Sequence, residues 1–451
     1  MTNYDVIEAY VEDFTNWNYV KARGVATISQ HKFIITECIL KGLSIVEDIQ
    51  EPYSNLTVRI IGITDNQEVL ITDYVNGKHQ IINTITEDGI YTIEDRHHFV
   101  GFGCNFVGTC NITIEQLPTS ILKDYSGNKH DAYLYGFKGR LNSGVGIYAQ
   151  DFTKWIFGSA IHNISTKAHN KLHIVKKNPN NYFGYTIGIQ KANYYNKPYK
   201  LKFNFNKEID DINFSVVSTD GNLITTQCFS AIINNGSVVD VPIISEEIFN
   251  NQKEPNIYYD FGTNKDIEID VELIPDYPNQ LCYDGKSYAV AYGLPILTDY
   301  TVIADRTWFA EKVDNGVFMS KALEQNGAFI LEYKQGDKWN TYSYYSATNI
   351  NIDKDNSIVY QTKNKYNEQT IYLGDKQDTD TLFIGTIRKD DSRSFIGCHG
   401  DILLFNRTLT DDELSVIKEV VFGISDIKDA LLTVDKKYIK LNDNNYIKLN
   451  K

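Results

Sequence analysis

Residues 395–414 read Phe-Ile-Gly-Cys-His-Gly-Asp-Ile-Leu-Leu-Phe-Asn-Arg-Thr-Leu-Thr-Asp-Asp-Glu-Leu, which is a strand pattern followed by a helix start. Within it, the apolar run 402–405 is short enough for a buried strand. Thr410 is followed three residues later by Glu413, which is a capping box and predicts that a helix begins there. A strand that leads into so well specified a helix is typical of an element that closes a sheet begun far upstream.

The composition favours β structure. The chain has 451 residues, with 31 Tyr and 22 Phe against only 2 Met. Tyr and Phe suit a half-buried pleated surface, and a chain of this length is expected to form two to four domains. The net charge of −14 argues against nucleic acid or an anionic membrane as the main partner.

Three further features bear on the compartment. The sequence has no apolar stretch of about 18 residues, so we expect no membrane-spanning segment. The acidic N-terminus does not read as a signal peptide. The six cysteines are scattered without C-x-x-C pairs, so we expect reduced thiols and synthesis in a cytosol. They are Cys38, Cys104, Cys110, Cys228, Cys282 and Cys398.

An internal repeat indicates duplicated domains. Asp-Phe-Thr-Asn-Trp at 13–17 recurs as Asp-Phe-Thr-Lys-Trp at 151–155, and Ile-Thr-Ile-Glu-Gln-Leu-Pro at 112–118 recurs as Ile-Asp-Val-Glu-Leu-Ile-Pro at 269–275. Short alternating apolar runs separated by turn signals lie between these markers, which predicts β-sandwiches. The two predicted sandwiches are module 1 (14–118) and module 2 (151–275).

The remaining chain resembles a known fold. Four motifs occur in the order of the laminin-G-like or concanavalin-A-like jelly roll: Asp-Tyr-Ser-Gly-Asn at 124–128, Tyr-Asp-Gly-Lys-Ser-Tyr at 283–288, Asp-Tyr-Thr-Val-Ile-Ala-Asp at 299–305, and the closing stretch from Gly400. The resemblance covers 119–150 plus 276–423. It implies a mainly β chain in which two duplicated sandwich modules accompany a split jelly roll, with module 2 inserted into it.

Split jelly rolls beside duplicated sandwiches resemble fibre and other virion proteins of bacteriophages that infect gut Bacteroidota. The resemblance implies a non-enzymatic structural virion protein, a head or tail fibre or decoration subunit made in the bacterial host cytoplasm. Its expected partners are further copies of itself, other virion proteins and host-surface glycans, without nucleic acid or membrane insertion. The alternatives are a carbohydrate-binding adhesin and a concanavalin-fold glycoside hydrolase.

Both ends of the chain carry their own predicted elements. Residues 1–13 show apolar side chains at three- and four-residue spacing, which predicts an amphipathic helix that either covers module 1 or docks into an assembly. In the tail, 424–451, the sequence Tyr-Ile-Lys-Leu at 438–441 recurs at 446–449. This repeat predicts a hairpin, which serves either as a charged edge against aggregation or as an attachment ribbon.

One strand carries paired carboxylates. In Asp-Ile-Glu-Ile-Asp-Val-Glu at 266–272, the side chains of Glu268, Asp270 and Glu272 share one face of a strand. Glycoside hydrolysis needs such pairs, and the pattern resembles the active strand of concanavalin-fold glucanases. The plainer interpretation is a polar outer face opposite an apolar core, and we assign no catalytic residue.

Metal-binding patterns are weak. His162, His169 and His173 lie close in sequence without a nearby cysteine or carboxylate at suitable spacing, and the adjacent histidines 97–98 would point to opposite faces of a strand. We therefore predict no metal centre and no cofactor. The jelly-roll resemblance does imply calcium on rim loops, for which the candidate ligands are Asp124, Asn128 and Asp284.

A Tyr- and Ser-rich stretch is the candidate binding surface. Sugars stack their apolar faces on aromatic rings, and Trp339, Tyr342, Tyr344 and Tyr345 are the candidate glycan contacts. On a continuous strand, Tyr342 and Tyr344 would share one face and Tyr345 would point to the other. The alternative is that these aromatic residues belong to the core.

Overall fold

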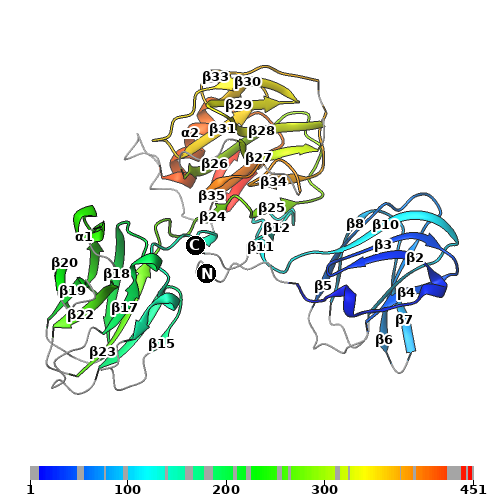
Figure 1. The fold of residues 1–451 in the computed structure, drawn as a ribbon. Coiled ribbons are helices and arrows are strands. Elements are labelled where there is room, and N and C mark those ends of the chain that lie inside the picture. Colours follow the sequence, from blue (N-terminus) through cyan, green and yellow to red (C-terminus); the bar gives the residue numbers. More distant parts are fainter. Residues whose placement is uncertain are drawn as a thin grey trace.

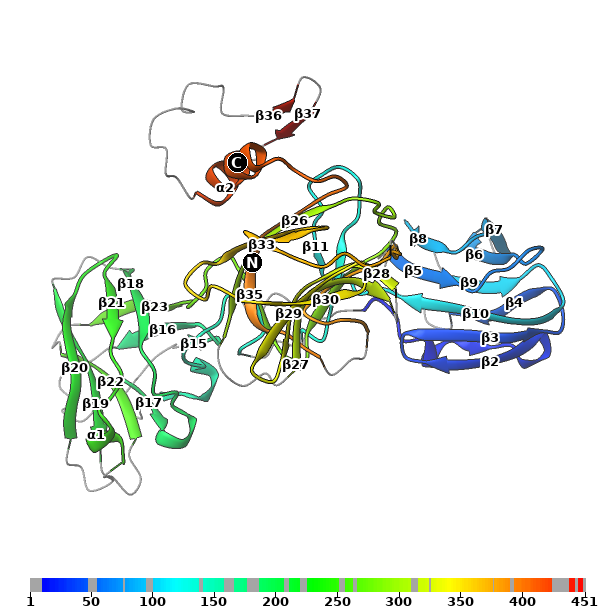
Figure 2. The ribbon, with the colours of Figure 1, turned by 90° about the horizontal axis from the view of Figure 1, so that it is seen from above.

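A computed structural model describes most of the chain. It describes residues 10–47, 55–75, 78–94, 100–137, 141–157, 166–176, 186–206, 211–219, 225–250, 256–262, 266–309, 315–323, 326–375, 377–389, 393–423, 438–442 and 445–448. Figures 1 and 2 show modules 1 and 2 on opposite sides of a central jelly roll. The predicted fold class, mainly β with sandwich modules and a jelly roll, is confirmed.

Module 1 consists of two packed antiparallel sheets, with strand orders β1-β4-β9-β6-β7 and β2-β3-β10-β5-β8. The first sheet contains β1 (Asn18–Tyr19), β4 (Gly42–Val46), β6 (Val69–Val75), β7 (Lys78–Ile85) and β9 (Gly101–Cys104). The second contains β2 (Gly24–Ser29), β3 (Lys32–Cys38), β5 (Leu56–Ile61), β8 (Gly89–Ile93) and β10 (Gly108–Gln116). Two short 3₁₀ helices, η1 (Phe14–Asn16) and η2 (Lys21–Arg23), flank β1.

Module 2 repeats this topology strand for strand, with orders β14-β17-β22-β19-β20 and β15-β16-β23-β18-β21. The first sheet contains β14 (Ile156–Phe157), β17 (Ile187–Gln190), β19 (Ile212–Thr219), β20 (Thr225–Ile233) and β22 (Asn256–Gly262). The second contains β15 (Thr166–Lys167), β16 (Lys171–Lys176), β18 (Tyr199–Phe205), β21 (Val238–Val241) and β23 (Ile267–Ile274). Its helices are η3 (Phe152–Lys154), η4 (Lys191–Asn193) and α1 (Glu246–Asn250).

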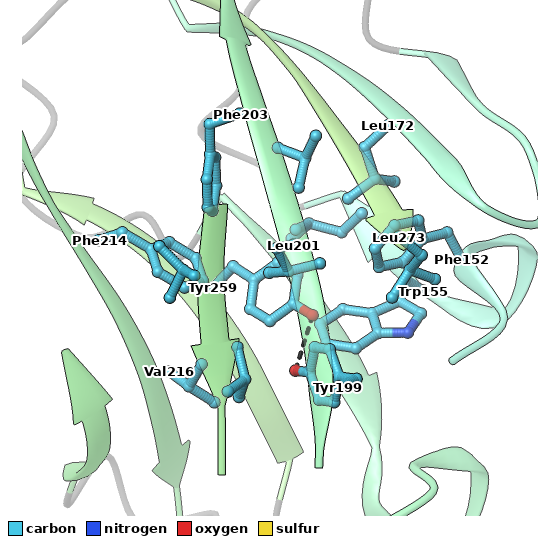
Figure 3. Packing of buried hydrophobic residues seen from close by; sticks show 14 of the residues in the cluster. Phe152, Trp155, Leu172, Tyr199, Leu201, Phe203, Phe214, Val216, Tyr259 and Leu273 are labelled. Carbon is cyan, nitrogen blue, oxygen red and sulfur yellow. Dashed lines mark hydrogen bonds between the residues drawn. The ribbon is translucent and has the colours of Figure 1, made fainter. Parts of the chain in front are cut away.

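The repeated Asp-Phe-Thr-x-Trp motif has the same structural role in both modules. The side chain of Asp13 accepts a hydrogen bond from the backbone N–H of Thr15, which caps η1, and Asp151 caps η3 through Thr153 in the same way. In module 2, the Trp155 ring packs 4.4 Å from the ring centre of Tyr259 in the core (Figure 3). The motif therefore starts each sandwich by capping a turn and delivering two aromatic rings to the core.

The jelly roll packs an eight-stranded sheet on a seven-stranded one, with orders β11-β12-β25-β34-β27-β28-β29-β30 and β13-β24-β35-β26-β31-β32-β33. The first contains β11 (Ile121–Leu122), β12 (Ala132–Tyr135), β25 (Tyr288–Ala291), β27 (Asn315–Leu323), β28 (Asn326–Gln335), β29 (Lys338–Ser343), β30 (Ser346–Ile350) and β34 (Leu382–Ile384). The second contains β13 (Gly144–Val145), β24 (Leu281–Asp284), β26 (Thr301–Trp308), β31 (Ile358–Thr362), β32 (Lys365–Tyr366), β33 (Gln369–Thr370) and β35 (Ile396–Phe405).

Module 2 occupies the connection between two paired strands. Strands β13 and β24 are antiparallel neighbours in which Gly144 lies opposite Cys282. Beyond them, the N–H of Gly146 donates to the carbonyl of Gln280, and the N–H of Asp276 donates to that of Ile147. The two chain crossings into module 2 thus lie side by side. A hairpin connection tolerates such an insertion because its ends are already close together.

The closing stretch behaves as its sequence predicts. Strand β35 is an interior strand of the seven-stranded sheet, between β24 and β26, and helix α2 (Asp411–Phe422) follows it. The capping box of Thr410 and Glu413 is present in both directions, and Gly423 ends α2 in the left-handed conformation at φ 70°. Buried Ile417 packs α2 onto the outer face of this sheet. The prediction of a closing element is therefore confirmed.

Module 1 contacts the other sheet of the jelly roll. Leu117, which follows β10, packs into a cluster with Tyr135 and Tyr292 from the outer face of β12 and the end of β25. The guanidinium of Arg59 lies 4.3 Å from the ring centre of Tyr292. These contacts place a cationic and an apolar side chain of module 1 against an aromatic face of the jelly roll.

Two expectations about the chain need correction. Residues 1–9 of the predicted N-terminal helix lie outside the described residues, but residues 10–13 are not helical, because Asp13 adopts extended dihedral angles to cap η1. The prediction that all cysteines are reduced is wrong for Cys38 and Cys104. These two residues form a disulfide between β3 and β9, and thus between the two sheets of module 1. The tail hairpin is confirmed, with β36 (Tyr438–Asn442) paired to β37 (Asn445–Lys448).

Candidate glycan-contact surface

The candidate aromatic residues lie on a hairpin at the edge of the eight-stranded sheet. Strands β29 and β30 are joined by the two-residue turn Tyr344-Tyr345, in which both residues have positive φ, 43° and 64°. This turn geometry is usual for Asn-Gly, and bulky residues rarely adopt it. The turn ends the strand alternation that the sequence alone predicts, and it changes the direction of the tyrosine side chains.

Two of the four candidate contacts therefore belong to the core. Tyr344 is only 1% exposed, and its hydroxyl donates to the carbonyl of Leu297 at 3.2 Å. Trp339 is half-buried on the inner side of β29, with its ring 4.9 Å from that of Trp308. The alternative interpretation, that these aromatic residues belong to the core, therefore holds for Tyr344, because the turn folds its ring inward.

The other two candidates lie together on the outer side. Tyr345 is 45% exposed, and its ring centre lies 6.2 Å from that of half-buried Tyr342. The segment 372–374 runs beside the same hairpin, since the N–H of Tyr372 donates to the hydroxyl of Thr348. Tyr372 is 70% exposed. We call Tyr342, Tyr345 and Tyr372 the aromatic rim. Sequence inspection missed Tyr372 because it lies in an unremarkable loop.

The paired carboxylates of β23 lie on the outer face of module 2. Their apolar neighbours along the strand are buried, as the alternating pattern predicts. The Asp270 carboxylate accepts a hydrogen bond from His173 Nδ1 at 2.9 Å, and the Lys171 ammonium lies 3.7 Å away. Glu272 pairs in register with both Lys171 and Lys202. This arrangement supports the plainer interpretation, a polar outer face with cross-strand basic partners.

The predicted metal ligands do not converge within the described part of the chain. Asp124 accepts hydrogen bonds from the backbone of Ser126 and His130, and Asp284 accepts from the backbone of Lys286 and Ser287. Each carboxylate thus caps its own turn. His169 contacts Asp151 and His173 contacts Asp270, whereas residues 97–98 and 162 lie outside the described chain. The Asn128 side-chain amide donates to the Ser126 hydroxyl at 2.9 Å, within the 124–131 loop. No group of three metal-ligating side chains occurs among the described residues.

A buried ionic cluster, which sequence inspection missed, fastens the two sheets of the jelly roll. A bulge in β28 puts Glu332 in the left-handed conformation at φ 57°, and its carboxylate turns into the core. It accepts hydrogen bonds from Arg306 at 2.7 and 2.5 Å, from Trp308 at 2.7 Å and from Tyr366 at 2.6 Å. Burial alone would lower the pKa of Arg306, but the Glu332 carboxylate outweighs it and raises that pKa. Arg306, Glu332 and Tyr366 are buried, so the cluster holds the two sheets together as an internal clasp.

A second pair, Lys321 with Asp378, is also buried. The Lys321 ammonium lies 2.6 Å from the Asp378 carboxylate, which also accepts from the backbone N–H groups of Leu297 and Ala328. The chain segment that precedes β34 is thereby fixed to β27 and β28. Like the Glu332 clasp, this pair is satisfied internally and does not face a cleft.

His399 is a buried, neutral histidine in the closing strand. Its Nδ1–H donates to the carbonyl of Gly400 at 2.7 Å, so its Nε2 accepts from the Tyr283 hydroxyl at 3.0 Å. Burial lowers the pKa of His399 to about 4. Protonation would remove the acceptor that Tyr283 uses and leave a buried charge.

We expect this histidine to make the jelly roll sensitive to acid. In the unfolded chain its pKa is about 6.5, so as the pH falls from about 6.5 to about 4 the unfolded state takes up a proton that the folded state does not. The unfolding free energy therefore keeps its full value above about pH 6.5 and falls by about 3 kcal/mol as the pH drops to about 4. Unfolding measured against pH should show this loss in wild type and a flatter profile in His399→Gln. The exposed His79→Gln serves as the matched control and should keep the wild-type profile.

Comparison with known proteins adds little about function. No family model and no curated protein matches the sequence. Among solved structures, the chain is similar to the N-terminal CBM22-1-CBM22-2 tandem domain of Paenibacillus barcinonensis Xyn10C, at 10% identity over 59% of this chain and 93% of that one, with a TM-score of 0.21. It is also similar to Trypanosoma rangeli sialidase, at 10% identity, 89% and 84% coverage and a TM-score of 0.24.

A third similar structure is a chain from the entire lipid-containing bacteriophage PM2, at 9% identity, 82% and 92% coverage and a TM-score of 0.13. At such scores these likenesses carry nothing about what the chain binds, and the fold rests on the sheets described above. Among the described residues, no helix is long and apolar enough to cross a membrane.

Proposed function

We propose that this chain is a non-enzymatic structural subunit of a bacteriophage virion, a fibre or decoration protein, whose jelly roll contacts host-surface glycans. The observation that carries the proposal is the aromatic rim, which is exposed on a jelly roll held between two copies of one sandwich module (Figure 1). Such an architecture supplies reach and rigidity, and the rim supplies a surface for stacking on sugar rings.

The ionic groups of the described chain support a role without catalysis. The Glu332 and Lys321 pairs are buried and satisfied by their partners, and Asp270 and Glu272 of β23 have basic cross-strand partners. Catalytic groups usually face a cleft with a perturbed pKa and an accessible partner. The clasp and the buried pair instead hold sheets together, as expected of a scaffold.

The geometry of the rim supports the glycan contact. Tyr344 and Tyr345 both adopt a conformation that costs on the order of 1 kcal/mol for such residues. The burial of Tyr344 and its hydrogen bonds, including backbone pairing to Ala328, hold this turn in place. The turn presents Tyr345 outward, and the segment that carries exposed Tyr372 is bonded to the same hairpin through Thr348. Exposed rings on a rigidly held backbone bind sugars with a small entropy cost, because little freedom is lost on binding.

We expect the double variant Tyr345→Ala/Tyr372→Ala to lose glycan binding by at least about tenfold, since each ring contributes roughly 1 kcal/mol or more of stacking. The measurement is a glycan array with the purified full chain. Tyr125→Ala is the matched control, because Tyr125 is 82% exposed in the loop between β11 and β12, and β11 forms the opposite edge of the sheet from β30.

The control should bind like wild type. If the double variant still binds glycans like wild type, the aromatic rim is not the binding surface. A folded wild-type chain that binds no glycan on a broad array would remove the glycan contact altogether.

A stand-alone glycan-binding adhesin remains the second candidate, since the same rim would serve it. Light scattering on the purified full chain separates the two. The virion subunit should form a defined homo-oligomer, consistent with repeated placement on a particle, whereas an adhesin that acts as a monomer would keep the mass of one chain.

A further inference from the structure

Two buried cysteines lie directly opposite each other in the jelly roll. Cys282 in β24 and Cys398 in β35 are register partners on adjacent antiparallel strands, and both are 0% exposed. They are separate from the Cys38–Cys104 disulfide of module 1, and both are free thiols in the structure. The hydrogen bond with the Cys398 thiol, together with burial, raises the pKa of Cys282.

The backbone hydrogen bonds show which kind of pair this is. The N–H of Gly285 donates to the carbonyl of Phe395 at 3.1 Å, so these two residues form a hydrogen-bonded pair. Pair types alternate along an antiparallel ladder, so Cys282 and Cys398, three positions further along the same register, form a non-hydrogen-bonded pair. The Cα atoms of such pairs lie roughly 4.5 Å apart, within the range that a disulfide spans.

The pair also lies beneath the crossing into module 2. The Cys398 thiol donates to the side-chain oxygen of Gln280 at 2.7 Å, and the Cys282 thiol contacts the Gln280 carbonyl at 3.8 Å. That same carbonyl accepts from the N–H of Gly146, on the other crossing strand. A covalent link at this position would act where both connections to module 2 meet the jelly roll.

We propose that Cys282 and Cys398 form a disulfide that fastens β24, the strand through which the chain re-enters the jelly roll after module 2, to the closing strand β35. The oxidant is a low-molecular-weight disulfide such as oxidised glutathione. One protein thiolate attacks it to give a mixed disulfide, and the second thiolate then displaces the remaining thiol. Two protein thiols become one disulfide, and one oxidant disulfide becomes two thiols.

Because both thiols are buried in the folded chain, oxidation must precede closure of the crossing segments over them. The test is therefore refolding. The full chain is reduced and denatured, refolded in a glutathione redox buffer, quenched in acid, alkylated under denaturing conditions and digested for mass spectrometry. We expect a cross-linked peptide pair that contains Cys282 and Cys398 and is about 2 Da lighter than its reduced parts. Alkylation should mark Cys110 and Cys228 only, so two free thiols remain in place of four.

Variants make the result specific. Cys110→Ser should leave the Cys282–Cys398 cross-link unchanged, whereas Cys398→Ser should leave Cys282 alkylated and the Cys38–Cys104 link intact. A folded wild-type chain in which Cys282 and Cys398 are both alkylated would overturn the proposal. A Cys398→Ser chain in which Cys282 forms a disulfide with Cys110 or Cys228 would also overturn it, because the pairing of β24 with β35 would then not determine the disulfide partner.

Discussion

Replacing Glu332 with alanine should cost the jelly roll about 3–5 kcal/mol of unfolding free energy. The substitution leaves the Arg306 guanidinium, which is 3% exposed, without its carboxylate in the core. It also removes the acceptor for the Trp308 indole N–H and the Tyr366 hydroxyl. An uncompensated buried cation costs far more than a lost surface contact, so the effect should be among the largest of any single change.

Urea-dependent hydrogen exchange read by mass spectrometry is the appropriate measurement, because a multidomain chain does not unfold in one step. Protection should fall in β26, β28 and β31 and stay unchanged in module 1. Asp337→Ala, at an exposed position in the turn between β28 and β29, is the matched control and should cost less than about 0.5 kcal/mol. The double variant Arg306→Met/Glu332→Leu should recover part of the loss. A cost below about 1 kcal/mol for Glu332→Ala would mean that the carboxylate is not in the core.

Removing the disulfide of module 1 should be the second large effect. Cys38 and Cys104 are separated by 66 residues and join the two sheets of the sandwich. The link limits the freedom of the unfolded chain, so Cys38→Ser should destabilise module 1 by about 2–4 kcal/mol. Hydrogen exchange again resolves the modules, and protection should fall in β3 and β9.

Module 2 provides the internal control for this experiment. It has the same topology, but its described residues contain no disulfide, and buried aromatic residues such as Trp155 and Tyr259 fill its core (Figure 3). A reducing agent should therefore lower protection in wild-type module 1 and leave module 2 unchanged. Equal protection of module 1 with and without the reducing agent would contradict the structural role of the disulfide.

Local patterns in the sequence predict the fold well wherever one segment contains the whole signal. The capping box of Thr410 and Glu413 specifies the start of α2 from within four residues. The alternation of β23 specifies which side chains are buried, and the repeated Asp-Phe-Thr-x-Trp motif marks the start of each module. In each case the physical cause is local hydrogen bonding or strand periodicity.

The same reasoning fails where a residue departs from its local pattern. A continuous strand would put Tyr344 on the same face as Tyr342, but tyrosine in a positive-φ turn gives no sequence signal, and the turn sends the ring inward. Glu332 stands in an apolar run of β28, and only the bulge, which depends on pairing with β29, turns its carboxylate into the core. Two of the four candidate contacts, Trp339 and Tyr344, therefore belong to the core, and the ionic clasp of Glu332 has no signal in the sequence.

Pairing between residues far apart in the chain is the second feature that the sequence alone does not predict. The Cys38–Cys104 link depends on two strands in different sheets, and no spacing rule connects them. Strand pairing likewise sets where module 2 is inserted, because β13 and β24 are neighbours although module 2 separates them in the sequence. The repeat and the motif order predict that an insertion exists, whereas the pairing of these strands explains why the jelly roll accommodates it.

The most direct test of the central claim is to look for this chain in purified phage particles from the host that produces it, by mass spectrometry followed by imaging of the particles. A structural virion subunit should be present in a fixed, symmetry-related number of copies and be located on the particle surface with the aromatic rim exposed. A chain that is made during infection but is absent from purified particles would contradict the account.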